Sequence, residues 1–154
     1  MGDSTQDSKN SPEARQFDFW IGDWAVREPD GSLAGHNRIE PILGGAALRE
    51  AWQGESGHAG TSLNAWDPIS GVWRQAWTDV NGFWLWLEGG FQGEAMILEG
   101  ELPSQADPTQ LVRHRISWSL IEGDPDQLRQ HWEVSQDGGT SWQTLFDGRY
   151  TRQG

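Results

Sequence analysis

A few polar side chains set among large apolar residues are the groups of this chain that could do chemistry. Glu50, Asn64, Gln75, His114 and Gln130 are each followed, two positions later, by a tryptophan or an isoleucine. Residues two apart in a β-strand point to the same face, so each polar group would have apolar neighbours. Desolvation raises the pKa of a carboxyl group, and histidine titrates near neutral pH. We therefore predict Glu50 and His114 as the catalytic acid-base pair if the protein is an enzyme.

The tryptophans favour a different use of the same region, the binding of a small molecule. The chain has 154 residues and 11 tryptophans, and tryptophan offers a large flat apolar surface with one N–H donor. Apolar walls with a few convergent polar groups are the usual form of a small-molecule site. The alternative is a polar network that satisfies only itself, with buried waters. The predicted ligand-binding residues are Trp52, Asn64, Trp66, Gln75, Trp77, Leu87, Trp118, Gln130 and Trp132.

These residues lie in short segments in which apolar and polar residues alternate with a period of two. Gly, Pro, Asp and Asn separate the segments. This pattern is typical of an antiparallel all-β domain. Tight turns between successive runs favour an up-and-down meander, which avoids exposed edges by closing into a barrel. We predict a single barrel of about ten strands, at 23–28, 36–43, 46–53, 60–67, 72–79, 83–91, 94–102, 111–121, 128–136 and 142–151.

A cross-strand charge pair supports one register for the middle strands. If "DPISG" and "VNG" each close a hairpin, Arg74 lies opposite Glu88 and Asn64 lies opposite Gln75. Opposite charges in such a pair are favourable. The face that carries Asn64 and Gln75 also carries most of the apolar residues, so we expect it to be the interior.

The same alternation assigns faces elsewhere in the sheet. Trp84 and Trp86 fall on the outer face, where they form a candidate apolar contact patch. In the later strands the even positions, such as His114 and Gln130, should point inward. A slip of one residue would exchange the two faces of those strands.

The first residues divide into a polar tail and an aromatic segment. Residues 1–15 contain no aromatic residue, so we expect a disordered tail there, followed by the barrel domain at 16–152. The segment "FDFWIGDW", residues 17–24, is typical of one helical turn that leads into a strand. We expect Phe17, Phe19 and Trp20 to form the apolar face of a short helix that closes one barrel end, with Trp24 in the first strand beneath it.

One turn carries a known motif. The segment "SQDGGTSW", residues 135–142, fits the S-x-D-x-G-x-x-W pattern of the Asp-box, a β-hairpin motif found in sialidases and other β-proteins. Its Asp and Gly residues stabilise the turn while the Trp packs beneath it. Because the motif occurs once, it predicts a hairpin and not sialidase activity.

Five segments together resemble an uncharacterised bacterial family of lipocalin-like, or calycin-type, β-barrel proteins. They are "FDFWIGDW", "NRIEPILGG", "GTSLNAWDPISGVWRQAW", "LEGGF" and "RQHWEVSQDGGTSW". The resemblance covers residues 16–152 and implies a barrel with a short helix at one end. Calycin-type barrels mostly bind small apolar ligands, and a minority are isomerases, cyclases, hydratases or decarboxylases, so the resemblance implies the fold and offers these activities only by analogy of fold.

Charge and composition narrow the classes of partner. The formal net charge is −12 and the single lysine is Lys9, which disfavours binding to nucleic acid. No apolar run reaches the roughly 18 residues of a membrane span, and no signal-peptide core is visible, so we expect a cytoplasmic protein that binds no membrane. The chain has no cysteine, and its histidines show no metal-ligand spacing, so we predict no metal and no cofactor. A haem-binding barrel with His58 or His131 as axial ligand is the alternative.

We therefore predict a protein that binds a small, flat or apolar molecule in an aromatic-lined barrel. One alternative is an isomerase, cyclase or hydratase that uses Glu50 and His114. The other is an interaction module that forms a homodimer through the outer face at Trp84 and Trp86.

Overall fold

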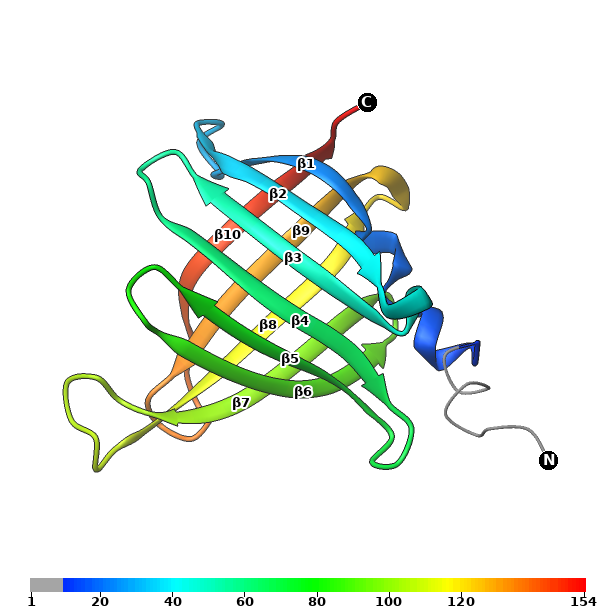
Figure 1. The fold of residues 1–154 in the computed structure, drawn as a ribbon. Coiled ribbons are helices and arrows are strands. Elements are labelled where there is room, and N and C mark those ends of the chain that lie inside the picture. The colour runs from blue at the N-terminus through cyan, green and yellow to red at the C-terminus, as the bar shows by residue number, and fades with distance from the viewer. Residues whose placement is uncertain (1–9) are drawn as a thin grey trace.

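The chain folds into a closed antiparallel barrel of ten strands (Figure 1). The computed structural model describes residues 10–154. Each strand pairs with its neighbours in sequence, and β1 pairs with β10 to close the barrel. This confirms the predicted all-β, up-and-down barrel. The strands are β1 (Gly22–Arg27), β2 (Leu33–Ile42), β3 (Ala47–Gly54), β4 (Ala59–Asp67), β5 (Val72–Asp79), β6 (Trp84–Gln92), β7 (Ala95–Pro103), β8 (Leu111–Ile121), β9 (Asp124–Ser135) and β10 (Gln143–Arg152).

The turn between β8 and β9 is tighter than predicted. The predicted strands 111–121 and 128–136 leave residues 122–127 to the turn, whereas β9 begins at Asp124, which pairs with Ile121. The two residues between them, Glu122 and Gly123, have φ of 53° and 72°. Two successive positive φ angles make the two-residue hairpin turn whose twist matches that of the flanking strands. The strand therefore gains four residues at its start.

The predicted register is confirmed in both parts of the sheet. Asn64 lies opposite Gln75, and Arg74 lies opposite Glu88, with which it forms an ion pair. In the later strands Trp118 pairs with Gln130, and both side chains are buried. The even positions of β8 and β9 therefore point inward, as the alternation predicts.

The outer face of β6 carries two exposed tryptophans. The exposed fractions of Trp84 and Trp86 are 61% and 57%. Leu63, which lies on the outer face two strands away, is also more than half exposed. A homodimer contact through this face stays a prediction.

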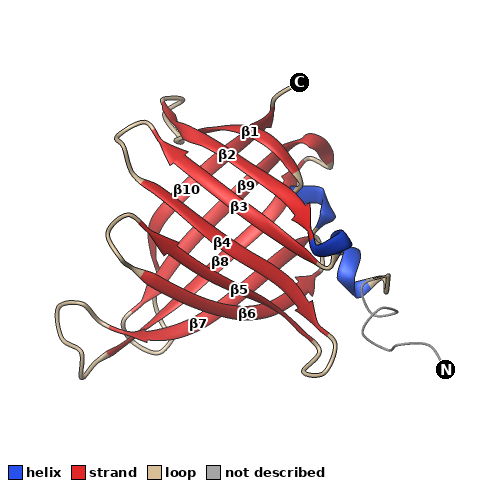
Figure 2. Ribbon diagram, in the orientation of Figure 1, coloured by secondary structure: helices blue, strands red, loops and turns tan. Residues whose placement is uncertain are grey.

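Short 3-10 helices close one end of the barrel (Figure 2). They are η1 (Glu13–Arg15), η2 (Asp18–Trp20) and η3 (Leu43–Gly45). The Phe17 ring stacks on Trp20 with ring centroids 4.6 Å apart and meets Trp73 and Trp118 edge-on. Trp24 donates its Nε1 hydrogen to the Trp20 carbonyl at 2.9 Å. The predicted helical closure is thus confirmed, with η2 leading directly into β1.

The predicted disordered tail falls only partly within the structure. Residues 1–9 lie outside the described residues. Within residues 10–15, η1 forms an ordered turn, and its Ala14 side chain is buried. No helix of the described chain has both the length and the apolar character that crossing a membrane requires.

The Asp-box segment forms the hairpin between β9 and β10, as predicted. The Ser135 hydroxyl donates to Asp137 at 2.7 Å and accepts the backbone N–H of Gly139 at 2.8 Å. Hydrogen bonds from Ser141 and Ser135 lower the pKa of Asp137 to about 2. The Arg115 guanidinium lies 3.9 Å from the ring centroid of Trp142. The motif is therefore accounted for by turn structure.

Candidate functional site

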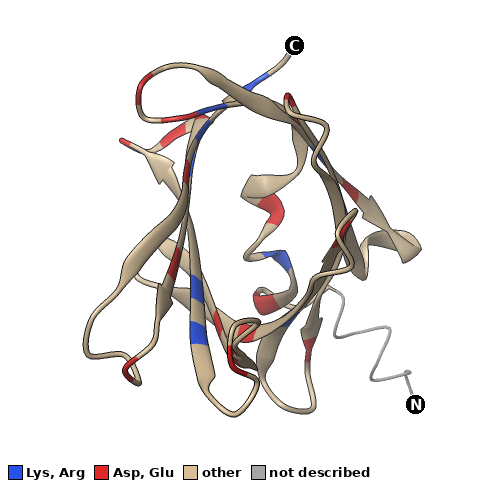
Figure 3. Cartoon of the chain, turned by 90° about the vertical axis from the view of Figure 1, so that its left-hand side faces the viewer, with Lys and Arg blue, Asp and Glu red and all other residues tan. Residues whose placement is uncertain are grey.

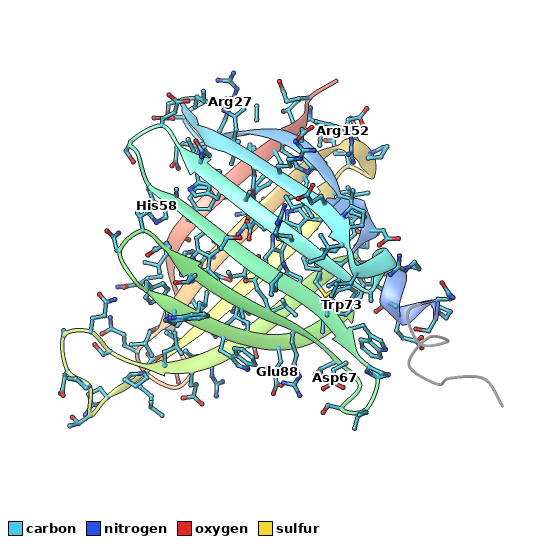
Figure 4. The ribbon with its side chains drawn as sticks, viewed as in Figure 1. Arg27, His58, Asp67, Trp73, Glu88 and Arg152 are labelled. Atoms are coloured by element: carbon cyan, nitrogen blue, oxygen red, sulfur yellow. The ribbon has the colours of Figure 1, made fainter. Side chains whose placement is uncertain are left out.

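A cavity of about 390 Å³ opens at the barrel end opposite the helices. Its rim includes Gly54, Ser56 and His58 from the end of β3 and the loop that follows, and Phe146 near the start of β10. Figure 4 labels His58 at this end and Trp73 toward the helical end. Figure 3 looks into the barrel from the open end, with the helices visible beyond. The barrel interior is thus packed at one end and hollow at the other.

Aromatic side chains form the walls of the cavity. They are Trp52 on β3, Trp77 on β5, Trp132 on β9 and Phe146 on β10. Trp52 and Phe146 meet nearly edge to face, with ring centroids 6.1 Å apart. The Nε1 hydrogens of Trp52 and Trp132 are donated to histidine nitrogens, at 3.3 and 3.1 Å. These bonds fix the ring orientations and satisfy the polar edge of each indole.

Glycines on the strands make room for these large rings. A Cβ atom added to Gly60 would lie 2.3 Å from the Trp77 ring, and one added to Gly148 would lie 2.6 Å from the Phe146 ring. Neither glycine has a positive φ that would call for glycine on conformational grounds. The absence of a side chain is therefore what lets the aromatic rings lie close to the strand backbone.

The floor of the cavity is polar, and Glu50 is its centre. The Glu50 side chain is buried, with an exposed fraction of 4%. Its Oε1 accepts a hydrogen bond from Ser62 Oγ at 2.7 Å, and its Oε2 accepts one from Asn37 Nδ2 at 2.8 Å. Burial raises the pKa of Glu50, and these two hydrogen bonds offset part of the rise. Glu50 is therefore a buried carboxyl group with a raised pKa in the cavity lining, and its catalytic role stays a prediction.

A chain of hydrogen bonds fixes the amide of Gln75 on the same floor. Asn64 Nδ2 donates to Ser62 Oγ at 2.9 Å and to the Leu48 carbonyl at 3.4 Å. This orientation directs Asn64 Oδ1 to Gln75, whose Nε2 donates to it at 2.7 Å. Because Gln75 Nε2 donates one of its two hydrogens to Asn64, its second N–H and its Oε1 are the groups left for the cavity. No described residue donates a hydrogen bond to that oxygen.

Tyr150 completes the floor on the opposite side. Asn37 Nδ2 donates to the Tyr150 hydroxyl at 2.9 Å, so the hydroxyl hydrogen goes to Gln130 Oε1. Burial and the nearby Glu50 raise the pKa of Tyr150 well above its usual value. The phenol is therefore neutral at physiological pH. The Gln130 amide nitrogen is left as the one side-chain donor of this pair, with no partner among the described residues.

A chain of hydrogen bonds through Trp52, His58 and Asp79 holds the rim of the cavity in place. His58 Nε2 lies 2.9 Å from Asp79 Oδ2, and His58 Nδ1 accepts the Trp52 N–H. Burial alone would raise the pKa of Asp79, but hydrogen bonds from His58 and from the Asn81 and Phe83 backbone outweigh it and lower the pKa. Both ring nitrogens of His58 are thus engaged in holding Trp52, which makes His58 a positioning residue in the described structure.

The predicted site residues separate by depth along the barrel. Asn64 lies behind Gln75, and Leu87 is buried in the core. Trp66 pairs with Trp73 near the helical end, where Trp118 contacts Phe17. Those that line the cavity are Glu50, Trp52, Gln75, Trp77, Gln130 and Trp132.

His114 lies outside the cavity lining. Its ring is buried, accepts the Trp132 N–H and lies 6.1 Å from the Phe83 ring. Burial lowers the pKa of His114, so the neutral form is favoured and Nδ1 can act as an acceptor. Its pairing with Glu50 in catalysis stays a prediction.

Sequence reasoning missed Phe146 and Tyr150 on β10, and it named His58 only as an axial ligand of the alternative haem site. A β-bulge lies between Thr144 and Phe146, where the register with β9 shifts. The extra residue turns Phe146 inward opposite Trp132, and Tyr150 follows on the same face. The only available signal was the aromatic pair itself at a spacing of four, since a bulge has no strict sequence signature.

The chain matches no protein-family model, and a search of curated proteins found no match either. Within residues 10–154, no three His, Asp or Glu side chains lie together as a metal site would require. The closed ten-stranded antiparallel barrel is compatible with a lipocalin-like fold.

Proposed function

We propose that the protein binds a small, flat or apolar molecule in the cavity at the open end of the barrel. The observation that carries this proposal is the combination of four aromatic walls with a polar floor in a cavity of about 390 Å³. Apolar walls remove ring surface from water, and a few fixed polar groups orient the ligand. The proposal includes membership of the lipocalin-like, calycin-type family, on the strength of the segments quoted above.

The test compares two tryptophan variants on adjacent strands. Trp77 lines the cavity, and its Nε1 has no hydrogen-bond partner among the described residues, so Trp77→Leu breaks no hydrogen bond. Trp84, on the outer face of β6, supplies the control Trp84→Leu. We expect naphthalene to bind the wild type one to one in calorimetry, and Trp77→Leu to weaken binding roughly tenfold through lost aromatic contact. Equal affinities in the two variants would place the probe outside the cavity.

An acid-base enzyme is the second candidate, favoured by one observation. Glu50 lines the cavity, and burial raises its pKa toward the range that suits a general acid. Because His114 lies outside the lining, proton transfer to a bound substrate would fall to Glu50. An isomerase, cyclase or hydratase of this kind would lose turnover in Glu50→Gln while it still bound its substrate.

A further inference from the structure

Glu50 is a buried carboxyl group without a basic partner. Both of its oxygens accept hydrogen bonds from neutral groups, Ser62 and Asn37. The cavity lining contains no lysine or arginine, and its one histidine, His58, is engaged with Asp79. An ionised carboxylate is costly to bury without a counter-charge. Burial therefore favours the neutral carboxyl group when the cavity is empty, and a cationic ligand would supply the counter-charge that the ionised form lacks.

The hydrogen-bonding groups around Glu50 are all neutral. The Asn37 amide donates both of its hydrogens, and its buried Oδ1 has no partner in the described structure. Gln75 Oε1 and the Glu50 carboxyl group are acceptors in the cavity lining, and the free donors there include the second Gln75 N–H, the Gln130 amide and Trp77 Nε1. Because the carboxyl group of Glu50 is the only group of the floor, among the described residues, that can carry a charge near neutral pH, a ligand group with positive charge fits this floor better than an anion.

The aromatic walls and the acidic rim of the cavity both favour a positively charged ligand. Aromatic faces attract cations through their ring quadrupoles, and several rings around one cation are a known way to recognise ammonium groups. Glu28, at the rim, is a second acidic residue in the lining. The formal net charge of the whole chain is −12, which draws cations toward the protein and repels anions.

We propose that the cavity takes an organic cation, an ammonium group carried on a flat or apolar body, with the ammonium group beside Glu50 and the body between the aromatic walls. This inference rests on the proposed binding function and specifies its ligand class. Burial of the ligand's apolar body contributes affinity, and the attraction between its positive charge and Glu50 favours it over a neutral ligand of the same shape.

Two probes of the same shape separate charge from shape. Trimethylphenylammonium and tert-butylbenzene differ in one central atom, nitrogen against carbon, and so in charge alone. We expect the wild type at pH 8 to bind the cation about tenfold more tightly than the neutral probe in calorimetry. Glu50→Gln should abolish this preference and retain the affinity for tert-butylbenzene. The control Glu94→Gln removes an equal charge from the exposed turn at the helical end and should keep the preference.

The outcomes of the probe experiment test the cation inference, the binding function and the role of Glu50 separately. Equal binding of both probes by the wild type would overturn the cation inference and leave the proposed binding function standing. Failure of both probes to bind would overturn the binding function itself. A cation preference that survives in Glu50→Gln would overturn the assignment to Glu50 and move it to Glu28, which Glu28→Gln then tests.

The wild type alone gives a second measurement if Glu50→Gln does not fold. Lowering the pH protonates Glu50, so affinity for the cation should fall while affinity for tert-butylbenzene stays constant. The other titratable groups of the cavity are Glu28, His58 with its partner Asp79, and Tyr150. Glu28→Gln repeats the titration without the rim carboxylate, and a pH dependence that vanishes in this variant would overturn the role of Glu50.

Discussion

At the scale of a single residue, the burial of Glu50 makes one contribution to the pH dependence of stability. Its unfolded-state pKa is near the ordinary value of 4.5, and burial raises the folded-state pKa above it. The folded state therefore favours the protonated form. The stability that this preference contributes is complete below pH 4.5 and is lost as the pH rises through the folded-state pKa.

The prediction is that the wild type loses stability relative to Glu50→Gln as the pH increases from 4.5. The difference in the free energy of unfolding should change by at most about 1.4 kcal/mol per pH unit across the window. Urea unfolding of both proteins from pH 4 to pH 8 measures it, since titrations elsewhere cancel in the difference. Glu94→Gln, at an exposed position, should run parallel to the wild type. Parallel curves for Glu50→Gln would contradict the prediction.

At the scale of the element, the backbone of β4 at Gly60 lies close against the Trp77 ring of the neighbouring strand β5. A Cβ atom at position 60 would approach Trp77 Cζ2 and Cη2 to 2.3 Å, so one of the two groups must move. We expect Gly60→Ala to displace the Trp77 ring, to lower the free energy of unfolding by about 1–3 kcal/mol, and to weaken naphthalene binding. Near-ultraviolet circular dichroism reports the ring movement, and calorimetry reports the affinity.

Gly90 on β6 provides the matched control for this change. A Cβ atom there would meet nothing within 4 Å, so Gly90→Ala should leave both the aromatic spectrum and the affinity unchanged. An unaltered spectrum in Gly60→Ala would show that the β4 backbone moves to make room for the new methyl group and that the Trp77 ring stays in place.

The strands could be predicted because apolar and polar residues alternate with a period of two wherever the strand pairing has no bulge. The register of β4, β5 and β6 followed from two turns and from the Arg74–Glu88 pair, and the structure confirms it. The inward face of β10 could not be predicted in the same way. Its bulge between Thr144 and Phe146 shifts the alternation, and the bulge depends on how β9 and β10 fit together. Tyr150 was missed for this reason.

At the scale of the whole molecule, the barrel has two unlike ends. The interior face predicted from sequence contains residues from both, because period-two alternation reports the face of a strand and not the depth along the barrel. Trp118 and Trp77 both point inward, but Trp118 packs against Phe17 at the helical end and Trp77 lines the cavity. Only the docking of η2 in three dimensions decides which end is filled.

This division predicts that the helical end sets stability and the open end sets binding. Phe17 is fully buried and contacts Trp20, Trp73 and Trp118, none of which lines the cavity. Phe17→Ala should therefore lower the free energy of unfolding by about 3–5 kcal/mol. The affinity for naphthalene, measured well below the unfolding temperature, should match that of the wild type.

Phe19 supplies the comparison, because its ring is only partly buried and packs against Phe91 at the edge of the same cluster. Phe19→Ala should destabilise the protein less than Phe17→Ala, again without an effect on affinity. Thermal unfolding and calorimetry on the same samples measure both quantities. If Phe17→Ala lost affinity in proportion to its lost stability, the two ends would be coupled through the floor at Tyr150, whose ring lies 5.8 Å from Trp24 beneath η2. If affinity stayed constant, the barrel would behave as a rigid container that is closed at one end and selective at the other.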